Sequence, residues 1–361
     1  MINLNYFSFL NNTGYGQSSI DYILALKKYS KCNIEINSIG GSINSDIIGK
    51  EKSDILKNII NKGKRSNEVA ILHSIPTIYS KYQNKYKKKI GFAIYETYDA
   101  PDSWIPILNR NDAIIVPSKF NKEVFLMKDI KKEIYHIPHC FDHNIFNDKY
   151  TKNKKINFLF IASWRQRKGY EVLCDVWAKY FYNNSDITLT IKTDKIDIAK
   201  EYIKQCYKRY HKKADISNIE FLNNKYKIED IGKIIGESHF VINPSMGEGF
   251  CLPGLFAMAC NVPFITTNYS GVLDYSNKDN SYLLDVDKYL PRPCLDNIPQ
   301  FKNRKWAIIS SETMKKAMFY CIDNYEEMQD RSKIAYKYVH EHYKYEHIAT
   351  KFDKMLEDVY G

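Results

Sequence analysis

The sequence predicts an α/β protein made of two parallel-sheet domains. In both halves, short apolar runs alternate with longer stretches of helical periodicity, which is the pattern of parallel strands joined by helices. The chain has 361 residues, enough for two domains with separate cores. A polar and charged stretch at 149–155 is typical of an interdomain linker. We therefore expect one domain at 1–150 and a second at 151–340.

Composition and charge narrow the class of protein. A hydrophobic fraction of 44% and a charged fraction of 26% are those of a soluble globular protein, and no apolar run is long enough to predict a membrane span. The start lacks the features of a signal peptide, and the eight cysteines form no CxxC pair. We therefore predict a cytoplasmic protein. Its net charge of +11 suits anionic partners, namely nucleotide sugars, acidic lipids or nucleic acid.

The first half contains candidate residues at the ends of its strands. A strand at 2–9 is followed by a glycine loop at 11–17, in which Gly14 and Gly16 are candidates for ligand contact or for a purely structural turn. Later strands end near His73 and Glu96. Ligands of parallel sheets bind at the carboxyl ends of strands, so both side chains are candidates, although a single strand-end histidine is often structural.

A strand at 156–161 is followed by a basic loop. This loop carries Arg165, Arg167 and Lys168 before Gly169. Arginine binds phosphate oxygens in a bidentate manner and lysine acts as a point charge, so the loop suits a diphosphate. A solvated surface loop is the alternative interpretation.

A second loop follows the strand at 240–244 and leads into a helix-like run at 255–259. Gly247 and Gly249 allow close approach of the backbone to a ligand. Glu248 could accept hydrogen bonds from sugar hydroxyls, and the N–H groups at the helix start favour an anion. A tight structural turn with a solvated glutamate is the alternative.

The last part of the chain carries different expectations. Residues 288–311 contain prolines and are expected to be irregular, and three helices are expected at 312–324, 325–341 and 345–359.

This second loop resembles the nucleotide-sugar site of the family 4 retaining glycosyltransferases, which have the GT-B fold. The resemblance is strongest at 90–146 and 156–275. The matching residues around the loop are Glu248, Gly249, Phe250, Leu252, Pro253, Ala257, Met258, Ala259 and Pro263. The resemblance implies two Rossmann-like domains facing across a cleft, an acceptor domain and a nucleotide-sugar domain, with a C-terminal helix at 341–361 that crosses back to the first.

The resemblance also implies a chemistry. The donor would be a nucleoside-diphosphate sugar, transfer would be of hexosyltransferase type with retention of configuration, and neither a metal ion nor another cofactor would be required. Arg167 and Lys168 would stabilise the diphosphate, with Arg165 as another candidate because the family's usual arginine position holds Ser163. Glu248 would bind sugar hydroxyls. The remaining assignments are Gly14 and Gly16 near the donor phosphates, His73 and Glu96 near the acceptor, and Gly247, Gly249, Phe250, Cys251 and Leu252 around the sugar.

Phe256 departs from the family pattern. The family has a second glutamate there, which binds the ribose, and phenylalanine cannot accept a hydrogen bond. Another side chain such as Asp274 could serve the ribose, the donor could be unusual, or the protein could bind without turnover. If a standard nucleotide is bound, Phe256→Glu is expected to tighten its binding.

Two further functions remain open from the sequence. One is a non-catalytic relative that binds a sugar nucleotide or a glycan. The other is a DNA-directed glycosyltransferase, for which the basic run at 85–89 leaves room. The net positive charge of the protein also fits peripheral contact with the inner face of an anionic membrane. The histidines at 136, 139 and 143 straddle a strand end and a loop, so no metal site is predicted there. The acceptor could be a glycan, a lipid-linked glycan or a protein, and no motif in the sequence identifies it.

Overall fold

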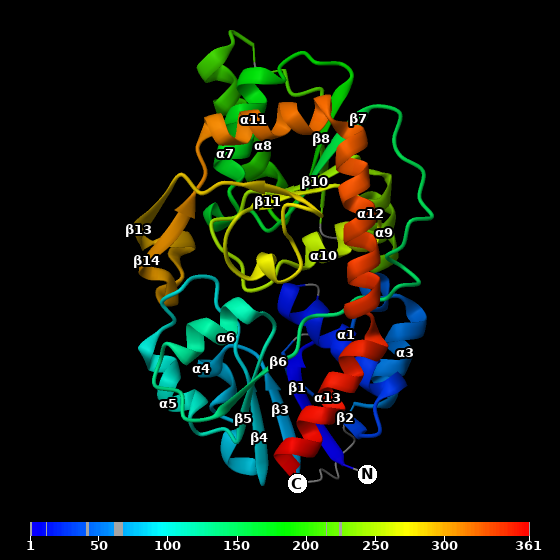
Figure 1. Cartoon of the computed structure of the whole chain (residues 1–361), viewed down its shortest axis with the longest axis vertical. Helices are drawn as coiled ribbons and strands as arrows, with labels where there is room; N and C mark the ends of the chain where they lie inside the picture. Colours follow the sequence, from blue (N-terminus) through cyan, green and yellow to red (C-terminus); the bar gives the residue numbers. More distant parts are fainter. Residues whose placement is uncertain are drawn as a thin grey trace. The chain divides into compact units, whose positions relative to one another are not determined.

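The computed structural model describes residues 2–11, 13–40, 43–60, 68–213, 215–223 and 226–360 (Figure 1). It divides into two compact units. Unit 1 comprises Met1–His143 with His340–Gly361, and unit 2 comprises Asn144–Val339. In the described residues each unit contains one six-stranded sheet whose paired strands are all parallel. The predicted α/β class is confirmed.

The sheet of unit 1 has the strand order β2-β1-β3-β4-β5-β6. The chain moves outward from β1 on one side to β2 and then crosses to β3 on the other side, so β1 and β3 form a topological switch point. The strands are β1 (Asn3–Phe9), β2 (Asn33–Gly40), β3 (Val69–His73), β4 (Lys88–Phe92), β5 (Ala113–Val116) and β6 (Glu133–His136). The helices are α1 (Gly14–Tyr29), α2 (Ser45–Ile48), α3 (Lys50–Asn58), α4 (Pro76–Tyr79), α5 (Ile105–Leu108) and α6 (Lys119–Leu126).

The last helix of the chain, α13 (Tyr345–Tyr360), belongs to unit 1 and packs against α1 (Figure 1). Its apolar positions recur at helical spacing, and Ile348, Phe352 and Leu356 are buried. The Tyr345 hydroxyl donates a hydrogen bond to Asp21 on α1 at 2.5 Å. The return of the C-terminal helix to the first unit is therefore confirmed.

The sheet of unit 2 has the strand order β12-β11-β10-β7-β8-β9. Here the switch point lies between β7 and β10, which are neighbours although they lie far apart in the sequence. The strands are β7 (Ile156–Ile161), β8 (Ile187–Lys192), β9 (Ile219–Leu222), β10 (Phe240–Asn243), β11 (Phe264–Thr267) and β12 (Tyr282–Leu284). The helices are α7 (Tyr170–Tyr180), α8 (Ile196–Tyr210), α9 (Ile228–Glu237), α10 (Leu252–Ala259), α11 (Ser311–Asp323) and α12 (Tyr325–His342).

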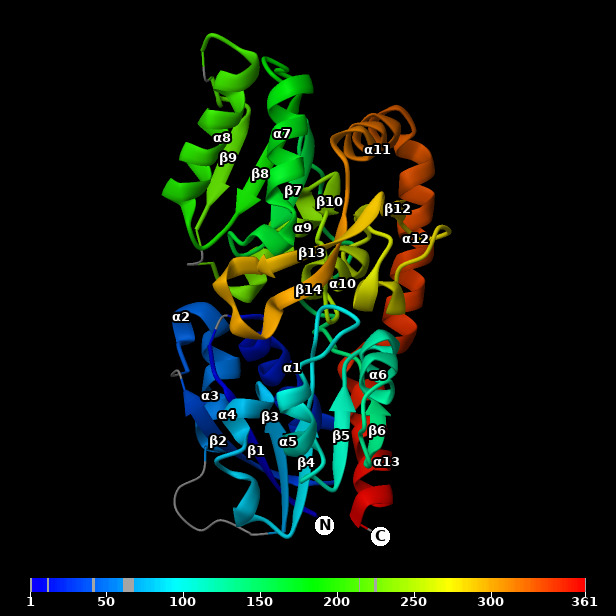
Figure 2. The same ribbon diagram turned by 90° about the vertical axis from the view of Figure 1, so that its left-hand side faces the viewer.

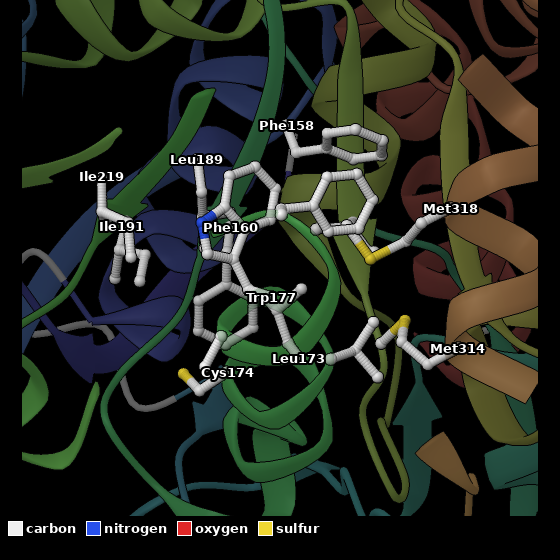
Figure 3. Packing of buried hydrophobic residues seen from close by; sticks show 14 of the residues in the cluster. Phe158, Phe160, Leu173, Cys174, Trp177, Leu189, Ile191, Ile219, Met314 and Met318 are labelled. Atoms are coloured by element: carbon white, nitrogen blue, oxygen red, sulfur yellow. The ribbon is translucent and has the colours of Figure 1, made fainter. Parts of the chain in front are cut away.

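The core of unit 2 holds β7 and β8 against α7 and α11. Trp177 on α7 is fully buried and stacks on Phe181 with a ring-centroid distance of 4.8 Å. Figure 3 shows Trp177 among side chains from the sheet and from α11, including Phe160 and Met318. This packing supports the strands whose carboxyl ends carry the loops described below.

Residues 288–311 are not irregular throughout, which corrects the expectation from the sequence. They contain an antiparallel hairpin of β13 (Lys288–Cys294) and β14 (Lys302–Ile308), drawn in orange in Figure 2. Pro291 is tolerated because a two-stranded ribbon has free edges that need no ladder hydrogen bond. Trp306 on β14 is completely buried. Burial of this aromatic side chain thus stabilises a hairpin in a segment whose prolines argue against strands.

Candidate functional site

The switch point of unit 2 brings two loops together. The basic loop follows β7, and the loop at 245–251 follows β10. Because β7 and β10 are parallel neighbours, both loops leave the sheet at the same edge. Ligands of open α/β sheets bind in the crevice that such a reversal of strand order creates.

Three charged side chains meet between these loops. Arg167 donates from Nη1 to the carbonyl oxygen of Gly247 at 2.8 Å and lies 3.1 Å from Oε2 of Glu248. The Nζ atom of Lys168 lies 2.6 Å from Oε1 of the same carboxylate. The Glu248 side chain is only 7% exposed. The two predicted loops therefore form one partly buried ion network.

Backbone contacts hold the two loops in register. Met246 N–H donates to the carbonyl oxygen of Arg167 at 2.8 Å, and the Ser245 hydroxyl donates to the same oxygen at 3.0 Å. Gly169 has φ +73, and a Cβ atom there would lie 1.9 Å from the carbonyl oxygen of Pro244. Only glycine combines this conformation with so close an approach.

The charges of the network leave an excess of positive charge. Burial raises the pKa of Glu248, but Lys168 and Arg167 outweigh this effect and lower it to about 2. The carboxylate is therefore ionised at neutral pH. Two cations and one anion leave a net charge of +1, so the site attracts a further anion.

A third loop, after β11, completes the support of Glu248. Glu248 N–H donates to the Ser270 hydroxyl at 2.8 Å, and Gly271 N–H donates to the Glu248 carbonyl oxygen at 2.9 Å. A Cβ atom on Gly271 would lie 2.0 Å from the carbonyl oxygen of Gly249. No role for Ser245, Ser270 or Gly271 was predicted from the sequence. The serine and glycine content of the turns was the available signal, but turns are commonly rich in these residues.

Tyr275 supports the start of α10. Cys251, the residue before the helix, has φ 77, and the Tyr275 hydroxyl donates to its carbonyl oxygen at 2.5 Å. The ring of Phe250 also packs on Tyr275, with centroids 5.1 Å apart. Burial raises the pKa of the Cys251 thiol to about 12, so the thiol stays protonated. The segment from Phe250 to Leu252 therefore presents backbone rather than a reactive side chain.

Phe256 is buried against another aromatic ring. It is 4% exposed, and its ring stacks on Phe146 with a centroid distance of 4.0 Å and an interplanar angle of 10°. The position that the family pattern gives to a carboxylate is occupied here by an aromatic pair. Its place in donor binding stays a prediction.

The switch point of unit 1 holds the other predicted residues. Gly14 begins α1, and Gly16 N–H donates to the Thr13 hydroxyl at 3.2 Å. A Cβ atom on Gly16 would lie 2.0 Å from the carbonyl oxygen of Asn11, whereas one on Gly14 would meet nothing within 4 Å. Gly16 is thus required by packing. Asn12, in the same predicted loop, lies outside the described residues.

His73 at the end of β3 is fully buried. Its Nδ1 atom lies 2.8 Å from the Tyr6 hydroxyl and 3.0 Å from the Ser19 hydroxyl, and its ring stacks on Phe92 at 4.0 Å. Burial lowers its pKa well below the usual range, so the ring is neutral. These contacts favour the structural alternative, and a role beside an acceptor stays a prediction.

Glu96 and Arg165 lie in loops and are partly exposed. The strand expected to end near Glu96 is β4, which ends at Phe92, so Glu96 follows it in a bend. Asn121 brackets the preceding residue, accepting from Tyr95 N–H at 3.1 Å and donating to its carbonyl oxygen at 2.6 Å. Arg165 accepts a hydrogen bond from Lys168 N–H at 2.9 Å through its carbonyl oxygen.

The described ranges contain neither a cluster of metal-ligating side chains nor a helix suited to span a membrane. No group of three or more His, Cys, Asp or Glu side chains there could hold a metal ion. None of the helices described is both long and apolar enough to cross a membrane.

Residues 142–289, which contain all three charged residues of the network, match the family model described as glycosyl transferases group 1. This part of the chain is therefore similar to that family. An uncharacterized glycosyltransferase of Methanocaldococcus jannaschii is 26% identical over 212 residues, which are 58% of this chain. The chain matches about half, 53%, of that relative's length.

Solved structures of glycosyltransferases share the fold of this chain. Anabaena HepE, in a structure with UDP and glucose, is 12% identical and superposes with a TM-score of 0.73 over 99% of this chain and 100% of its own. A glycosyltransferase from Rickettsia africae is 14% identical, with a TM-score of 0.72 over 99% of this chain and 98% of its own. The two Rossmann-like units with the returning C-terminal helix have the GT-B fold, as predicted.

Proposed function

We propose that this protein is a retaining glycosyltransferase of hexosyltransferase type that uses a nucleoside-diphosphate sugar. The observation that carries the proposal is the network of Arg167, Lys168 and Glu248 at the switch point of unit 2. It offers cations for a diphosphate and a carboxylate for sugar hydroxyls within a few ångströms of each other. A UDP-sugar is the first donor to test, because HepE structures with the same fold contain UDP and UDP-glucose.

Arg167 and Lys168 would bind the diphosphate and stabilise its charge as it leaves. Positive charge that is already in place lowers the barrier, and removal of one such donor typically costs about 3 kcal/mol. Both cations contact Glu248. A diphosphate would therefore share or replace the carboxylate as their partner.

Glu248 would orient the transferred sugar. Its low pKa keeps it ionised, so it acts as an acceptor and not as a general acid. A carboxylate has about four acceptor positions. It can therefore accept from sugar hydroxyls while it keeps its contacts with the cations.

The proposed transfer needs no covalent intermediate with the protein. The bond between the sugar C1 atom and the diphosphate oxygen breaks, and a bond from an acceptor oxygen to C1 forms on the same face. The acceptor proton passes to the departing phosphate. Cys251 is a poor nucleophile because its thiol is protonated. As the resemblance to the family implies, the proposal includes no metal ion.

Nucleotide binding and turnover test this function. We would titrate the protein with UDP, GDP, ADP and CMP, and then supply the responding nucleotide as its sugar conjugate. Arg167→Ala and Lys168→Ala should each weaken diphosphate binding about a hundredfold, whereas Lys233→Ala, an exposed lysine of the same unit, should not. The anomer first formed in the product, observed by ¹H NMR, tests retention. If the folded protein binds none of these nucleotides, the proposal is wrong.

One observation favours a second candidate, a relative that binds sugar nucleotides without transferring the sugar. Phe256 fills the place of a family carboxylate with a buried aromatic stack. Tight binding of a nucleotide sugar with neither transfer nor hydrolysis across a broad acceptor panel would support this candidate over the enzyme.

A further inference from the structure

We infer that the segment 288–308, here called the arm, holds the basic loop in its working position, and that Asp296 and Phe301 are positioning residues for Arg167. The arm contains β13, β14 and the turns between them. All but its first two residues lie beyond the segment matched by the family model, which ends at residue 289. The inference rests on the proposed function because it concerns the same cations.

Asp296 supports the start of the basic loop. Its Oδ1 atom accepts a hydrogen bond from Gln166 N–H at 2.6 Å. Gln166 begins the single helical turn η3 (Gln166–Lys168), and the capping residue Arg165 gives that turn no side-chain hydrogen bond. An aspartate from the arm therefore satisfies one of the N–H groups that the start of a helical turn leaves without an intrahelical partner.

The backbone around Asp296 is unusual in a way that fits this contact. Asp296 has φ 58 and Asn297 has φ 56, so two successive residues other than glycine are left-handed. Such conformations persist only where the surroundings enforce them, and they cluster at functional sites. Aspartate and asparagine are the side chains that tolerate this region best. Here the conformation directs a carboxylate to the basic loop.

Phe301 lies beneath the charged group itself. The Cζ atom of Arg167 is 5.9 Å from the centre of the Phe301 ring, within the range of a cation–π contact. Phe301 is buried and packs edge-to-face on Trp306, with centroids 4.9 Å apart. The buried aromatic pair of the arm, Phe301 and Trp306, thus supports the guanidinium group of Arg167.

A third contact joins the arm to the loop after β10. Ala307 N–H donates to the carbonyl oxygen of Met246 at 3.1 Å, and Met246 N–H donates to that of Arg167 at 2.8 Å. The arm therefore contacts both loops of the ion network. Loss of its contacts should misplace Arg167 while the charges of Arg167, Lys168 and Glu248 all remain.

Binding of UDP and UMP by arm variants tests the inference. Asp296→Ala and Phe301→Leu should each weaken UDP binding about tenfold, since small misplacements of a ligand-binding group have effects of this order. Asp296→Asn should bind UDP nearly as well as the unmodified protein, because its amide oxygen still accepts from Gln166 N–H. Lys302→Ala, which removes an exposed cation from the same arm, is the matched control and should change UDP binding less than twofold.

The ratio of the two affinities separates positioning from general damage. UMP lacks the second phosphate, so misplacement of Arg167 should reduce the preference for UDP over UMP. A distorted fold would weaken both ligands alike. Equal losses for UDP and UMP in Asp296→Ala and Phe301→Leu, or unchanged UDP binding in both, would overturn the inference.

Amide hydrogen exchange provides a test that needs no ligand. In the free protein, the Gln166 amide should exchange faster in Asp296→Ala than in Asp296→Asn. An unchanged exchange rate in Asp296→Ala would count against the inference. If the unmodified protein binds no nucleotide while Gln166 exchange responds as expected, the proposed function fails and the positioning contact stands. Should Asp296→Ala not fold, the Phe301→Leu comparison decides.

Discussion

The ammonium of Lys168 lies 2.6 Å from the carboxylate of Glu248, although β8, β9 and β10 separate the two residues in the sequence. Glu248 also contacts Arg167, so a single carboxylate neutralises part of the charge of both cations. Loss of the Glu248 charge should therefore affect nucleotide binding and sugar transfer in opposite directions.

Glu248→Gln should tighten the binding of UDP while it slows transfer. Loss of the negative charge raises the net charge of the network from +1 to +2, and we expect about tenfold tighter UDP binding at low salt. Sugar hydroxyls lose a charged acceptor worth about 1.5–3 kcal/mol, so transfer should fall at least about tenfold. Titration calorimetry and initial rates measure the two effects. Weaker UDP binding in this variant would contradict the electrostatic account.

Gly271→Ala should disturb the site through the backbone. The added Cβ atom would lie 2.0 Å from the carbonyl oxygen of Gly249, and the Gly271 N–H bond to Glu248 would have to move. We expect a loss of about 1–3 kcal/mol in unfolding free energy together with weaker UDP binding. Gly40→Ala is the control, because its Cβ atom would make ordinary contacts at 3.4 Å with Phe9. Equal stability of the two variants in urea would disprove the predicted clash.

Phe256→Glu should destabilise the protein rather than restore a ribose contact. The new carboxylate would replace a ring that stacks at 4.0 Å on Phe146 and is 4% exposed. Burial of an unpaired charge costs at least about 3 kcal/mol, whereas Phe256→Leu should lose only about 1 kcal/mol, the value of an aromatic pair beyond its burial. Urea unfolding measures both values. Normal stability of Phe256→Glu with tighter UDP binding would instead support the ribose interpretation made from the sequence.

Asp21 should make the attachment of the C-terminal helix depend on pH. Burial raises its folded-state pKa to about 6, although the charge of Lys52 and hydrogen bonds from Gln17 and Tyr345 partly oppose this. A raised folded-state pKa adds stability at low pH, and this stability disappears as pH rises through about 6. The loss corresponds to about 3 kcal/mol, since one pKa unit equals about 1.4 kcal/mol.

The difference in unfolding free energy between the unmodified protein and Asp21→Asn isolates this titration from others. Between pH 4 and pH 7 the unmodified protein should lose stability relative to the variant, because the amide does not ionise. His139, whose pKa burial lowers to about 3, contributes equally to both proteins and cancels. A pH-independent difference would show that Asp21 titrates normally.

Much of this protein could be predicted from local patterns. The alternation of apolar runs and helical stretches predicts both parallel sheets, because strand and helix periodicities depend on near neighbours in the chain. The loops with Arg167 and Glu248 stand out because basic and glycine-containing turns after strands are local features as well. The expectation at 288–311 was wrong, because prolines argue locally against strands while the burial of Trp306 is a tertiary effect.

Only the tertiary structure decided which of these features meet. Arg167 and Lys168 reach Glu248 because the sheet places β10 beside β7, and strand order is set by packing of the whole unit. Packing within unit 2 also pairs Phe256 with Phe146 and brings Asp296 to Gln166, and packing within unit 1 buries His73. By itself the sequence determined the elements and the chemistry of their loops, because those depend on short-range periodicity. The contacts that make a site depend on long-range packing, which a single sequence does not reveal.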